Sequence, residues 1–421
     1  MRSFNLKTFI IILATTLYSF CFASDSYLLT IKDIQQFQKK FNDKNFINLN
    51  LKNVNVVQFF GDESELNNLI EATDQVIRVE KNAELKLLDT VINTDSSFSK
   101  QWHLENTGLN SRTTVIVPGV KGEDIDAKKA WEITKGSNEI IIAVIDSGAD
   151  YNHPDLKKNI WRNNLELNGT PGVDDDNNGY IDDIYGYDFI NDDNNPIDDN
   201  GHGSHCSGII GSVHGNGGIM GVMGDVKIMP LKFIGENGVG TMDAVLKAID
   251  YAIEMGSNVI SNSWGGAPRE SVLSDLLKSA SDKGIFIVNA AGNSNLDSER
   301  FPIFPASYDI PGNTSVGATM GRGSRARFSN FGSTAVDVFA PGYNIYSTWR
   351  DGSYKKKSGT SMAAPIVAGM AGLALSINPK ISPDDLRSLI IESSEDIKAI
   401  RGLSIGGRVN AFNLLERVKN Y

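Results

Sequence analysis

The chain has 421 residues, of which 41% are hydrophobic and 22% charged, and this composition is ordinary for a soluble globular protein. It excludes collagen-like and wholly disordered proteins, and the presence of only two cysteines, Cys21 and Cys206, excludes a disulfide framework. The net charge of −11 argues against nucleic acid or an anionic membrane surface as the main partner.

The N-terminus has the pattern of a secretory signal peptide. Arg2 and Lys7 precede an apolar run, residues 9–22, that is too short for a confident membrane span, and the small Ala23 suits the residue before a cleavage point. A lipidated Cys21 is the alternative, although the bulky residue before it is a poor fit. We therefore expect residues 1–23 to be a signal peptide. The protein would be secreted, either extracellular or periplasmic if the source has two membranes, with no stable membrane anchor.

Residues 24–90 differ from the rest of the chain in composition, with many Asn, Lys and Leu residues and almost no Gly or Pro. The hydrophobic periodicity predicts strands at 27–31, 55–60 and 76–79, and helices at 33–41 and 63–72. We predict a small α+β domain here.

Residues 91–421 predict one large α/β domain. Nearly continuous β-branched runs at 140–145, 227–233, 258–261, 285–289 and 336–339 are typical of buried parallel strands. They alternate with helical patterns at 242–254, 272–281 and 361–376. This alternation predicts a doubly wound, mostly parallel sheet with helices on both faces.

Three expected junctions between strands and helices carry reactive side chains. Asp146 ends the first strand of the large domain, and His202 and Ser361 each open a helical run. A serine nucleophile, a histidine base and a buried aspartate that fixes the histidine tautomer form an acyl-transfer triad. Asn293 follows another strand after small residues, where its amide and the backbone N–H of Ser361 could stabilise an oxyanion. Each residue alone has a structural reading, as a turn, cap or surface residue, but their combination favours catalysis.

The acidic residues are concentrated between these junctions. Ten aspartates between Asp174 and Asp199 account for almost the whole net charge, and no Lys or Arg occurs between Arg162 and Lys227. These carboxylates repel one another, so a folded loop needs a cation.

Calcium is the predicted cation. Asp174, Asp176 and Asn178 match alternate ligand positions at the start of an EF-hand loop, followed by the carbonyl of Tyr180. The glutamate that ends an EF-hand loop is absent, so Asp183 or its neighbour Asp182 would close the site. A solvated acidic loop without a metal is the alternative.

Five sequence segments resemble those of subtilisin-like serine peptidases, the subtilase family. They are residues 143–148 (AVIDSG), 200–206 (NGHGSHC), 261–266 (SNSWGG), 290–293 (AAGN) and 359–365 (GTSMAAP). The order Asp, His, Ser along the chain is that of subtilisin. The resemblance implies Asp146, His202 and Ser361 as the triad and Asn293 in the oxyanion hole. It also implies that residues 24–90 are an inhibitory prodomain and that residues 91–421 are the peptidase domain.

The resemblance also suggests where substrate and further calcium ions bind. A peptide would lie as an added strand between residues 231–240 and the segment after the strand at 258–261, with a primary pocket closed by the loop before Asn293. The residues implied are Gly238, Gly240, Ser263, Trp264, Gly265, Ala291 and Gly292. These walls are uncharged, which argues against strict Arg or Lys specificity; Ile303 or Phe304 could narrow the pocket floor, and Trp264 could instead be a core aromatic residue. Two further calcium sites are implied, one at Asp188, Asn191 and Asp193, and one at Asp155 with carbonyls of residues 213–219 and Asp95.

The sequence therefore predicts a secreted serine endopeptidase, made as a self-processed precursor, that acts on protein or peptide substrates as a monomer. Its own prodomain would be an inhibitory partner, and nucleic acid would not be a partner. The alternative is a catalytically silent calcium-binding surface protein on the same fold. A dinucleotide enzyme is disfavoured because no G-x-G-x-x-G follows the first strand, and an α/β-hydrolase because Ser361 is not in G-x-S-x-G.

Overall fold

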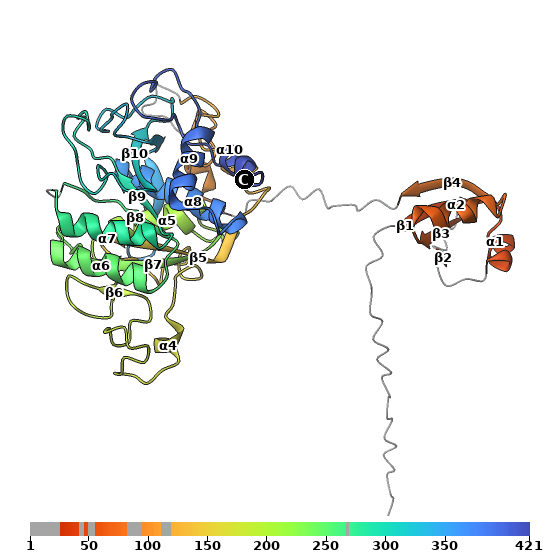
Figure 1. Cartoon of the computed structure of the whole chain (residues 1–421), viewed down its shortest axis with the longest axis horizontal. Coiled ribbons are helices and arrows are strands. Elements are labelled where there is room, and N and C mark those ends of the chain that lie inside the picture. The colour runs from red at the N-terminus through yellow and green to blue at the C-terminus, as the bar shows by residue number, and fades with distance from the viewer. Residues whose placement is uncertain (1–25, 42–45, 49–54, 82–94, 111–118, 267–268) are drawn as a thin grey trace, which may run out of the picture. The chain divides into compact units, whose positions relative to one another are not determined.

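The computed structural model describes residues 26–41, 46–48, 55–81, 95–110, 119–266 and 269–421 (Figure 1). The chain separates into two compact units, Met1–Val91 and Ile92–Tyr421. The expected signal peptide at 1–23 and the junction between the predicted prodomain and peptidase domain lie outside the described residues.

The first unit is a four-stranded antiparallel sheet with two helices. Its strands are β1 (Ser26–Ile31), β2 (Phe46–Asn48), β3 (Val56–Phe60) and β4 (Val76–Lys81), in the order β2-β3-β1-β4, and its helices are α1 (Ile34–Lys40) and α2 (Glu63–Glu71). Asp33 caps the first helix and Asp62 forms a capping box with Glu65 at the second. Leu29, Phe37 and neighbouring apolar residues form a core of their own.

The second unit is built around a seven-stranded sheet in which every pair of neighbours is parallel. The strands are β5 (Gly136–Asp146), β6 (Tyr187–Asp188), β7 (Asp225–Lys232), β8 (Val259–Asn262), β9 (Phe286–Ala290), β10 (Asn313–Thr319) and β11 (Val338–Pro341). Their order is β11-β10-β9-β8-β5-β7-β6. A separate antiparallel hairpin joins β12 (Ile345–Trp349) and β13 (Ser353–Lys357).

Helices cover both faces of this sheet. The longer helices are α5 (His202–Gly211), α6 (Met242–Glu254), α7 (Ser271–Asp282), α8 (Thr360–Ile377), α9 (Pro383–Ser393) and α10 (Ala411–Val418). Two short helices, α3 (Ala127–Ala130) and α4 (Asn164–Leu167), and a 3₁₀ turn at Phe98–Lys100 complete the unit.

Successive residues of β5 point to opposite faces, which explains the two cores. Ile142 and Val144 pack with α5 and α8, whereas Ala143 and Ile145 pack with α6 and α7. Figure 1 shows α6 and α7 side by side on one face. The expected doubly wound α/β fold with helices on both faces is therefore confirmed.

Helix α8 is long and apolar because it crosses the core. Within the described part of the chain it alone has the length and hydropathy of a membrane span, but 83% of that stretch is buried inside the protein.

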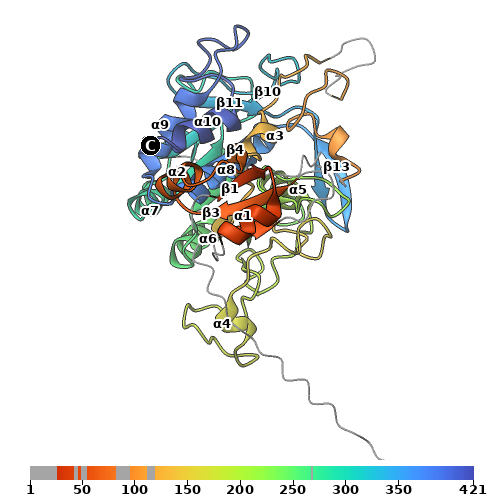
Figure 2. The ribbon, with the colours of Figure 1, turned by 90° about the vertical axis from the view of Figure 1, so that its right-hand side faces the viewer.

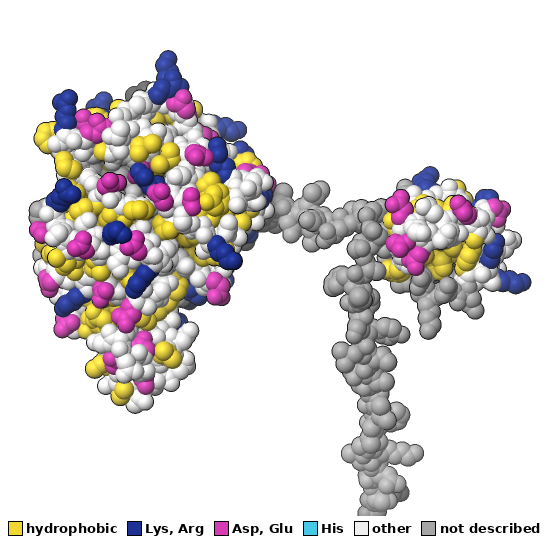
Figure 3. All heavy atoms as spheres, in the orientation of Figure 1, with side chains coloured by type: hydrophobic (Ala, Val, Ile, Leu, Met, Phe, Trp, Pro, Cys, Tyr) yellow, Lys and Arg dark blue, Asp and Glu magenta, His cyan; other side chains and the backbone are white. Residues whose placement is uncertain are grey.

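A lobe around α4 projects from the body of the second unit (Figure 1, Figure 2). It contains the aspartate-rich stretch, and no dark blue basic side chain is visible on it in Figure 3, whereas acidic and basic side chains are interspersed over the rest of that face. The excess negative charge is thus local in space as well as in sequence.

Candidate active site

The predicted catalytic residues gather at the carboxyl edge of the large sheet. Asp146 is the last residue of β5, Ser263 follows the end of β8, and Asn293 follows the end of β9. Two helices, α5 and α8, begin near the same edge with His202 and with Thr360 and Ser361. Open parallel sheets place their functional groups at this edge because the carboxyl ends of all the strands meet there.

Asp146 and His202 form a charge-assisted pair. The Nδ1 atom of His202 lies 2.8 Å from Oδ1 and 3.0 Å from Oδ2 of Asp146. The carboxylate is fully buried and also accepts a hydrogen bond of 2.7 Å from the backbone N–H of Ser147, whereas the imidazole is 26% exposed. With Nδ1 as the donor, Nε2 is left as the basic nitrogen. Burial lowers the pKa of His202, but the Asp146 carboxylate outweighs burial and raises that pKa well above its ordinary value.

The loop before His202 is held by Asp198, a residue that the sequence analysis did not single out. Its buried carboxylate accepts from the backbone N–H groups of Gly201 and Ser204, both at 2.7 Å, and from the hydroxyl of Ser147 at 2.8 Å. The strand end that carries Asp146 and the helix start that carries His202 are therefore fixed by one side chain.

Ser361 lies at the first turn of α8 with its hydroxyl donating to the carbonyl of Ser263 at 2.9 Å. Among the described residues no hydrogen bond joins its hydroxyl to His202, so attack requires a turn of the serine side chain. Catalytic hydrogen bonds are often absent or long until substrate binds.

Cys206 contacts both Ser361 and His202 from the buried side of the site. Its sulfur is 3.3 Å from the carbonyl oxygen of Ser361 and 4.0 Å from Nδ1 of His202. Burial raises the pKa of this thiol, so the side chain stays protonated and packs as a small apolar group.

The Asn293 amide is fixed in one orientation. Its Oδ1 accepts from the backbone N–H of Thr360 at 2.8 Å and from the Thr360 hydroxyl at 3.1 Å. The remaining Nδ2 donor is 3.4 Å from the position that a Cβ atom on Gly359 would take, and the Ser361 backbone nitrogen is 3.6 Å from that position. Glycine at 359 therefore leaves open the space between these two donors.

The predicted substrate-binding residues lie on two sides of this edge. On one side, Ile234 and Gly240 form an antiparallel bridge that closes a turn containing Gly238. A Cβ at Gly240 would come within 2.5 Å of the Phe233 carbonyl oxygen, so the turn requires glycine there. On the other side, the half-buried Trp264 packs edge-on against Phe233 at 5.1 Å between ring centroids.

Ile303 lies between the two glycine walls of the predicted primary pocket. A Cβ at Gly265 would be 3.1 Å from Cγ2 of Ile303, and a Cβ at Gly292 would be 2.7 Å from its Cδ1. Gly292, which follows Ala291, also has a φ of 103°, a conformation that favours glycine.

The lobe brings together three carboxylates, of which the sequence analysis named two. Carboxylate oxygens of Glu166, Asp176 and Asp183 lie within 4.8 Å of one another. No described Lys or Arg forms an ion pair with them, and burial raises the pKa of Asp183. Asn163 donates to Asp176 at 2.7 Å and to Asp183 at 2.8 Å. These groups could hold a metal ion, because closely spaced carboxylates without an ion-pair partner repel one another and a cation would relieve that repulsion.

Glu166 also organises the backbone of the acidic stretch. It accepts from the N–H groups of Asp175 at 2.7 Å, Asp176 at 3.1 Å and Asp182 at 2.9 Å. Glu166 stands outside the aspartate run, and the only sequence signal for it is an isolated acid between two leucines in a short helix.

The other residues of the first predicted calcium cluster lie in the same loop. Asp174 accepts from the backbone N–H of Asn178 at 3.1 Å, and Asn178 donates through its amide to Asp183 at 2.8 Å. The Asn178 amide oxygen accepts from the N–H of Tyr180 at 2.8 Å, and the ring of Tyr180 packs against Tyr187.

The second predicted cluster is only partly assembled. Asp188 is buried and accepts from the Asn191 amide at 2.7 Å, but the Asp193 carboxylate accepts from the N–H of Asn195 at 2.9 Å. The two aspartates meet through their backbones instead.

The two carboxylates of the third predicted cluster accept hydrogen bonds from N–H groups of residues 215–219, where the prediction expected carbonyl ligands. Asp155 accepts from the N–H of Ile219 at 2.8 Å and from the hydroxyl of Tyr354 at 2.9 Å. Asp95 accepts from the N–H groups of Gly215 at 2.8 Å and Gly217 at 2.9 Å. Both carboxylates therefore bind the same loop.

Comparisons with known proteins agree on one family. Residues 137–409 match the sequence profile of the subtilase family. The chain is 32% identical over 371 residues to subtilisin-like protease 1 of Plasmodium berghei, an alignment that covers 83% of this chain and 60% of that protein. It is 35% identical over 295 residues to thermitase of Thermoactinomyces vulgaris, covering 70% of this chain and 94% of thermitase.

The chain thus spans less than two thirds of the Plasmodium relative. Among solved structures, a protease from Pseudoalteromonas arctica superposes with a TM-score of 0.61 at 26% identity, covering 77% of this chain and 99% of that one.

Proposed function

Because this chain belongs to the subtilase family of subtilisin-like serine peptidases, we propose that it is a secreted serine endopeptidase that cleaves protein substrates through an acyl-enzyme. The observation that carries this proposal is the hydrogen-bonded Asp146–His202 pair at the same sheet edge as Ser361 and Asn293.

The triad would work in two half-reactions. His202, through Nε2, takes the proton of the Ser361 hydroxyl as that oxygen attacks the scissile carbonyl, and then gives the proton to the leaving amine. The new serine ester is hydrolysed by water with the same base. Asp146 keeps the proton of His202 on Nδ1 and stabilises the imidazolium that forms in each half-reaction.

The oxyanion would be bound by the Asn293 Nδ2 donor and the Ser361 backbone N–H. The orientation of the amide supports this role, because Thr360 occupies Oδ1 and leaves only the donor side for substrate. Preorganised donors of this kind stabilise charge that exists only in the transition state.

The substrate would bind as an extended strand, read mostly through its backbone. Gly238 and Gly240 would lie on one side of it, and Ser263, Trp264 and Gly265 on the other. We propose that Ile303, set between Gly265 and Gly292, shortens the primary pocket and favours small or medium apolar side chains.

The protein would be made as a precursor. Residues 1–23 would direct export, and residues 24–90 would be a prodomain that inhibits the enzyme until it is removed. The separate core and sheet of the first unit support an independently folding segment of this kind.

Calcium would be the structural cofactor, in keeping with the closely spaced acidic groups of the lobe. Glu166, Asp176 and Asp183 would supply carboxylate oxygens, with Asp174, Asn178 and the Tyr180 carbonyl as neighbours. Oxygen-rich sets of this type suit calcium better than a transition metal. Asp155, and less directly Asp188, Asn191 and Asp193, are candidates for further ions.

Replacing Ser361 with alanine tests the activity and the precursor together. The Ser361→Ala protein should lose casein hydrolysis, by about 10⁶ in kcat as measured for the equivalent loss in subtilisin. It should also accumulate as an uncut precursor that added wild-type enzyme can process. Normal casein cleavage would disprove the triad, and an inactive wild type that still binds calcium would favour a silent surface protein.

A further inference from the structure

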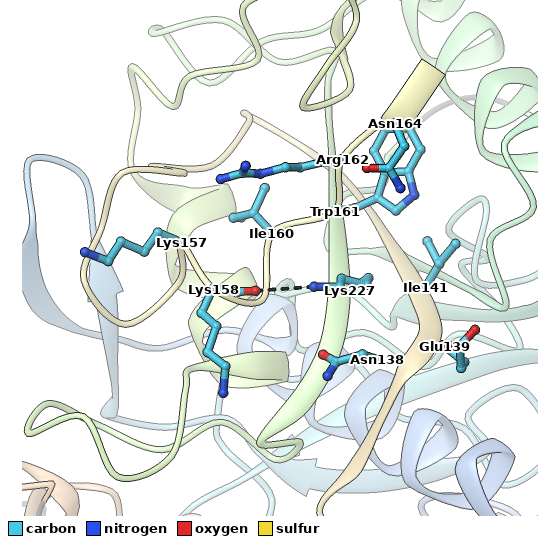
Figure 4. A pocket seen from close by; sticks show the side chains of 10 residues that line it. All are labelled: Asn138, Glu139, Ile141, Lys157, Lys158, Ile160, Trp161, Arg162, Asn164 and Lys227. Atoms are coloured by element: carbon cyan, nitrogen blue, oxygen red, sulfur yellow. Dashed lines mark hydrogen bonds between the residues drawn. The ribbon is translucent and has the colours of Figure 1, made fainter. Parts of the chain in front are cut away.

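A hollow lies near the amino ends of β5 and β7, whereas the triad lies at the carboxyl edge of the large sheet. Its volume is about 550 Å³, and it is lined by the N-terminal part of β5, by the start of β7 and by the loop before α4 (Figure 4). Its lining residue Ile141 lies five positions before Asp146 in β5, about 16 Å away at the usual rise of a strand. The hollow is therefore separate from the peptidase site.

Four basic side chains line this hollow: Lys157, Lys158, Arg162 and Lys227. They come from two segments, the loop before α4 and the start of β7, and none of the four forms an ion pair with a described residue. The one acidic residue of the lining is Glu139, which is exposed. Asp225 attracts Lys227, but it forms no ion pair with it. In a protein with a net charge of −11, four cations without an ion-pair partner among the described residues are a local reversal of charge around this hollow.

Lys227 is the central cation of the group. It is half-buried on β7, and its ammonium group donates to the carbonyl of Lys158 at 3.4 Å, which Figure 4 marks. Burial lowers the pKa of Lys227, and repulsion from Arg162 and Lys158 lowers it further. An anion in the hollow would relieve this repulsion.

The other lining groups suit the recognition of an oxyanion. Asn138 and Asn164 offer amide donors at the rim, and the guanidinium of Arg162 is placed over the ring of Tyr185, 5.5 Å from its centroid, which helps to hold it at the rim. A planar guanidinium together with several ammonium groups is the donor set that binds phosphate or sulfate groups well.

We propose that this hollow binds a phosphate or sulfate group, either free or carried on a small molecule such as a sugar. The site is distinct from the peptidase centre, and the proposal does not depend on the proposed activity.

Calorimetric titration of the full mature protein, blocked with a serine-directed inhibitor, tests the proposal. The probes are inorganic sulfate, glucose 1-phosphate and a sulfated disaccharide, chosen because they bind calcium weakly and would not strip the lobe. At least one should bind with a Kd of about 1 mM or tighter. Binding of sulfate alone would indicate a site for the free anion, and tighter binding of either sugar would indicate a site for the carried group.

Variants distinguish binding at this specific site from nonspecific electrostatic attraction of the anion. Lys227→Met and Arg162→Gln should each weaken binding by about tenfold or more, the value of one charge-assisted hydrogen bond. Lys247→Met, the same change at an exposed position on α6, should leave binding unchanged. Arg162 is on the surface, so its variant remains informative if Lys227→Met does not fold. Absence of binding by all three probes, or an equal loss in the Lys247 variant, would overturn the proposal.

Discussion

Asn293 is the residue whose geometry leads to the sharpest kinetic expectation. Asn293→Ala should lower kcat by about 10²–10³ with little change in KM, the magnitude known for the corresponding amide of subtilisin. Thr360→Val, which removes the hydroxyl but keeps the backbone N–H that also holds the amide, should cost much less. Steady-state kinetics on a peptide substrate measure both. An effect confined to KM would remove Asn293 from the oxyanion hole.

His202 should make activity and stability respond to pH in opposite directions. A base must be neutral, so kcat/KM should rise with pH through the pKa of His202, which the Asp146 carboxylate holds above the ordinary value. Because the folded-state pKa is raised, the stabilisation from the ion pair is complete below the unfolded pKa. It is lost as pH rises through the folded value.

The pH–rate profile and its Asp146→Asn counterpart measure this effect. The substitution should move the acidic limb of kcat/KM to lower pH and reduce the rate by about 10⁴, as in other triad proteases. An acidic limb that stays in place in Asp146→Asn would show that another group controls it. The apparent pKa of this acidic limb describes the coupled titration of His202 and Asp146 together.

At the scale of single elements, the segments after β8 and β9 shape the primary pocket. Ile303→Ala should raise kcat/KM for substrates with Phe before the cleaved bond, relative to Ala, by about tenfold or more, because it lengthens the space between Gly265 and Gly292. Paired peptides that differ only at that position give the ratio. An unchanged ratio would place the pocket floor elsewhere.

The strands of the large sheet that the sequence predicted correctly each contain a mainly apolar run. β5, β7, β8, β9 and β11 were predicted to within a few residues for this reason. β10 was missed although it lies between β9 and β11 in the sheet, since its residues, Asn313–Thr319, are mostly small and polar. Packing explains that composition: a Cβ on Gly317 would come within 2.4 Å of the Phe339 ring.

Polar side chains of the candidate active site could be predicted where a sequence motif falls at the end of a strand or the start of a helix. Asp146 and His202 follow from their positions at a strand end and a helix start, and they meet as expected. Glu166 could not be foreseen, because its hydrogen bonds to the backbone of residues 175–182 depend on how the lobe folds. The direction of the Ser361 hydroxyl could not be predicted either, because it depends on the side-chain rotamer, which the sequence does not determine.

At the scale of the whole molecule, removal of calcium should destabilise the enzyme through the lobe. A cation bound only by the folded state stabilises it by about 2.7 kcal/mol at a hundredfold excess over Kd. Chelation should therefore lower the Tm of the inhibited enzyme and, in the active enzyme, expose residues 174–199 to self-cleavage.

Thermal unfolding in calcium and in chelator measures the effect, and Glu166→Gln should reduce it. Lys278→Met, on the exposed face of α7, is the control outside the lobe. Superimposable melting curves, together with elemental analysis that finds no bound calcium, would rule out the metal.

The parallel sheet has a consequence for the order in which the molecule becomes active. Strand β5, which ends in Asp146, pairs with β7 and β8, and the helix that carries Ser361 comes later than every strand of the sheet. The contacts that assemble the triad therefore have high contact order. Folding dominated by such distant pairings is slow. The most distant strand pairing of the first unit, Tyr27 with Lys81, spans less of the chain than the pairing of Ile142 with Val259 in the second unit. The proposed cleavage of peptide bonds should therefore begin only after almost the whole chain has been synthesised and has folded. The delay built into the topology would itself protect the producing cell from its own enzyme.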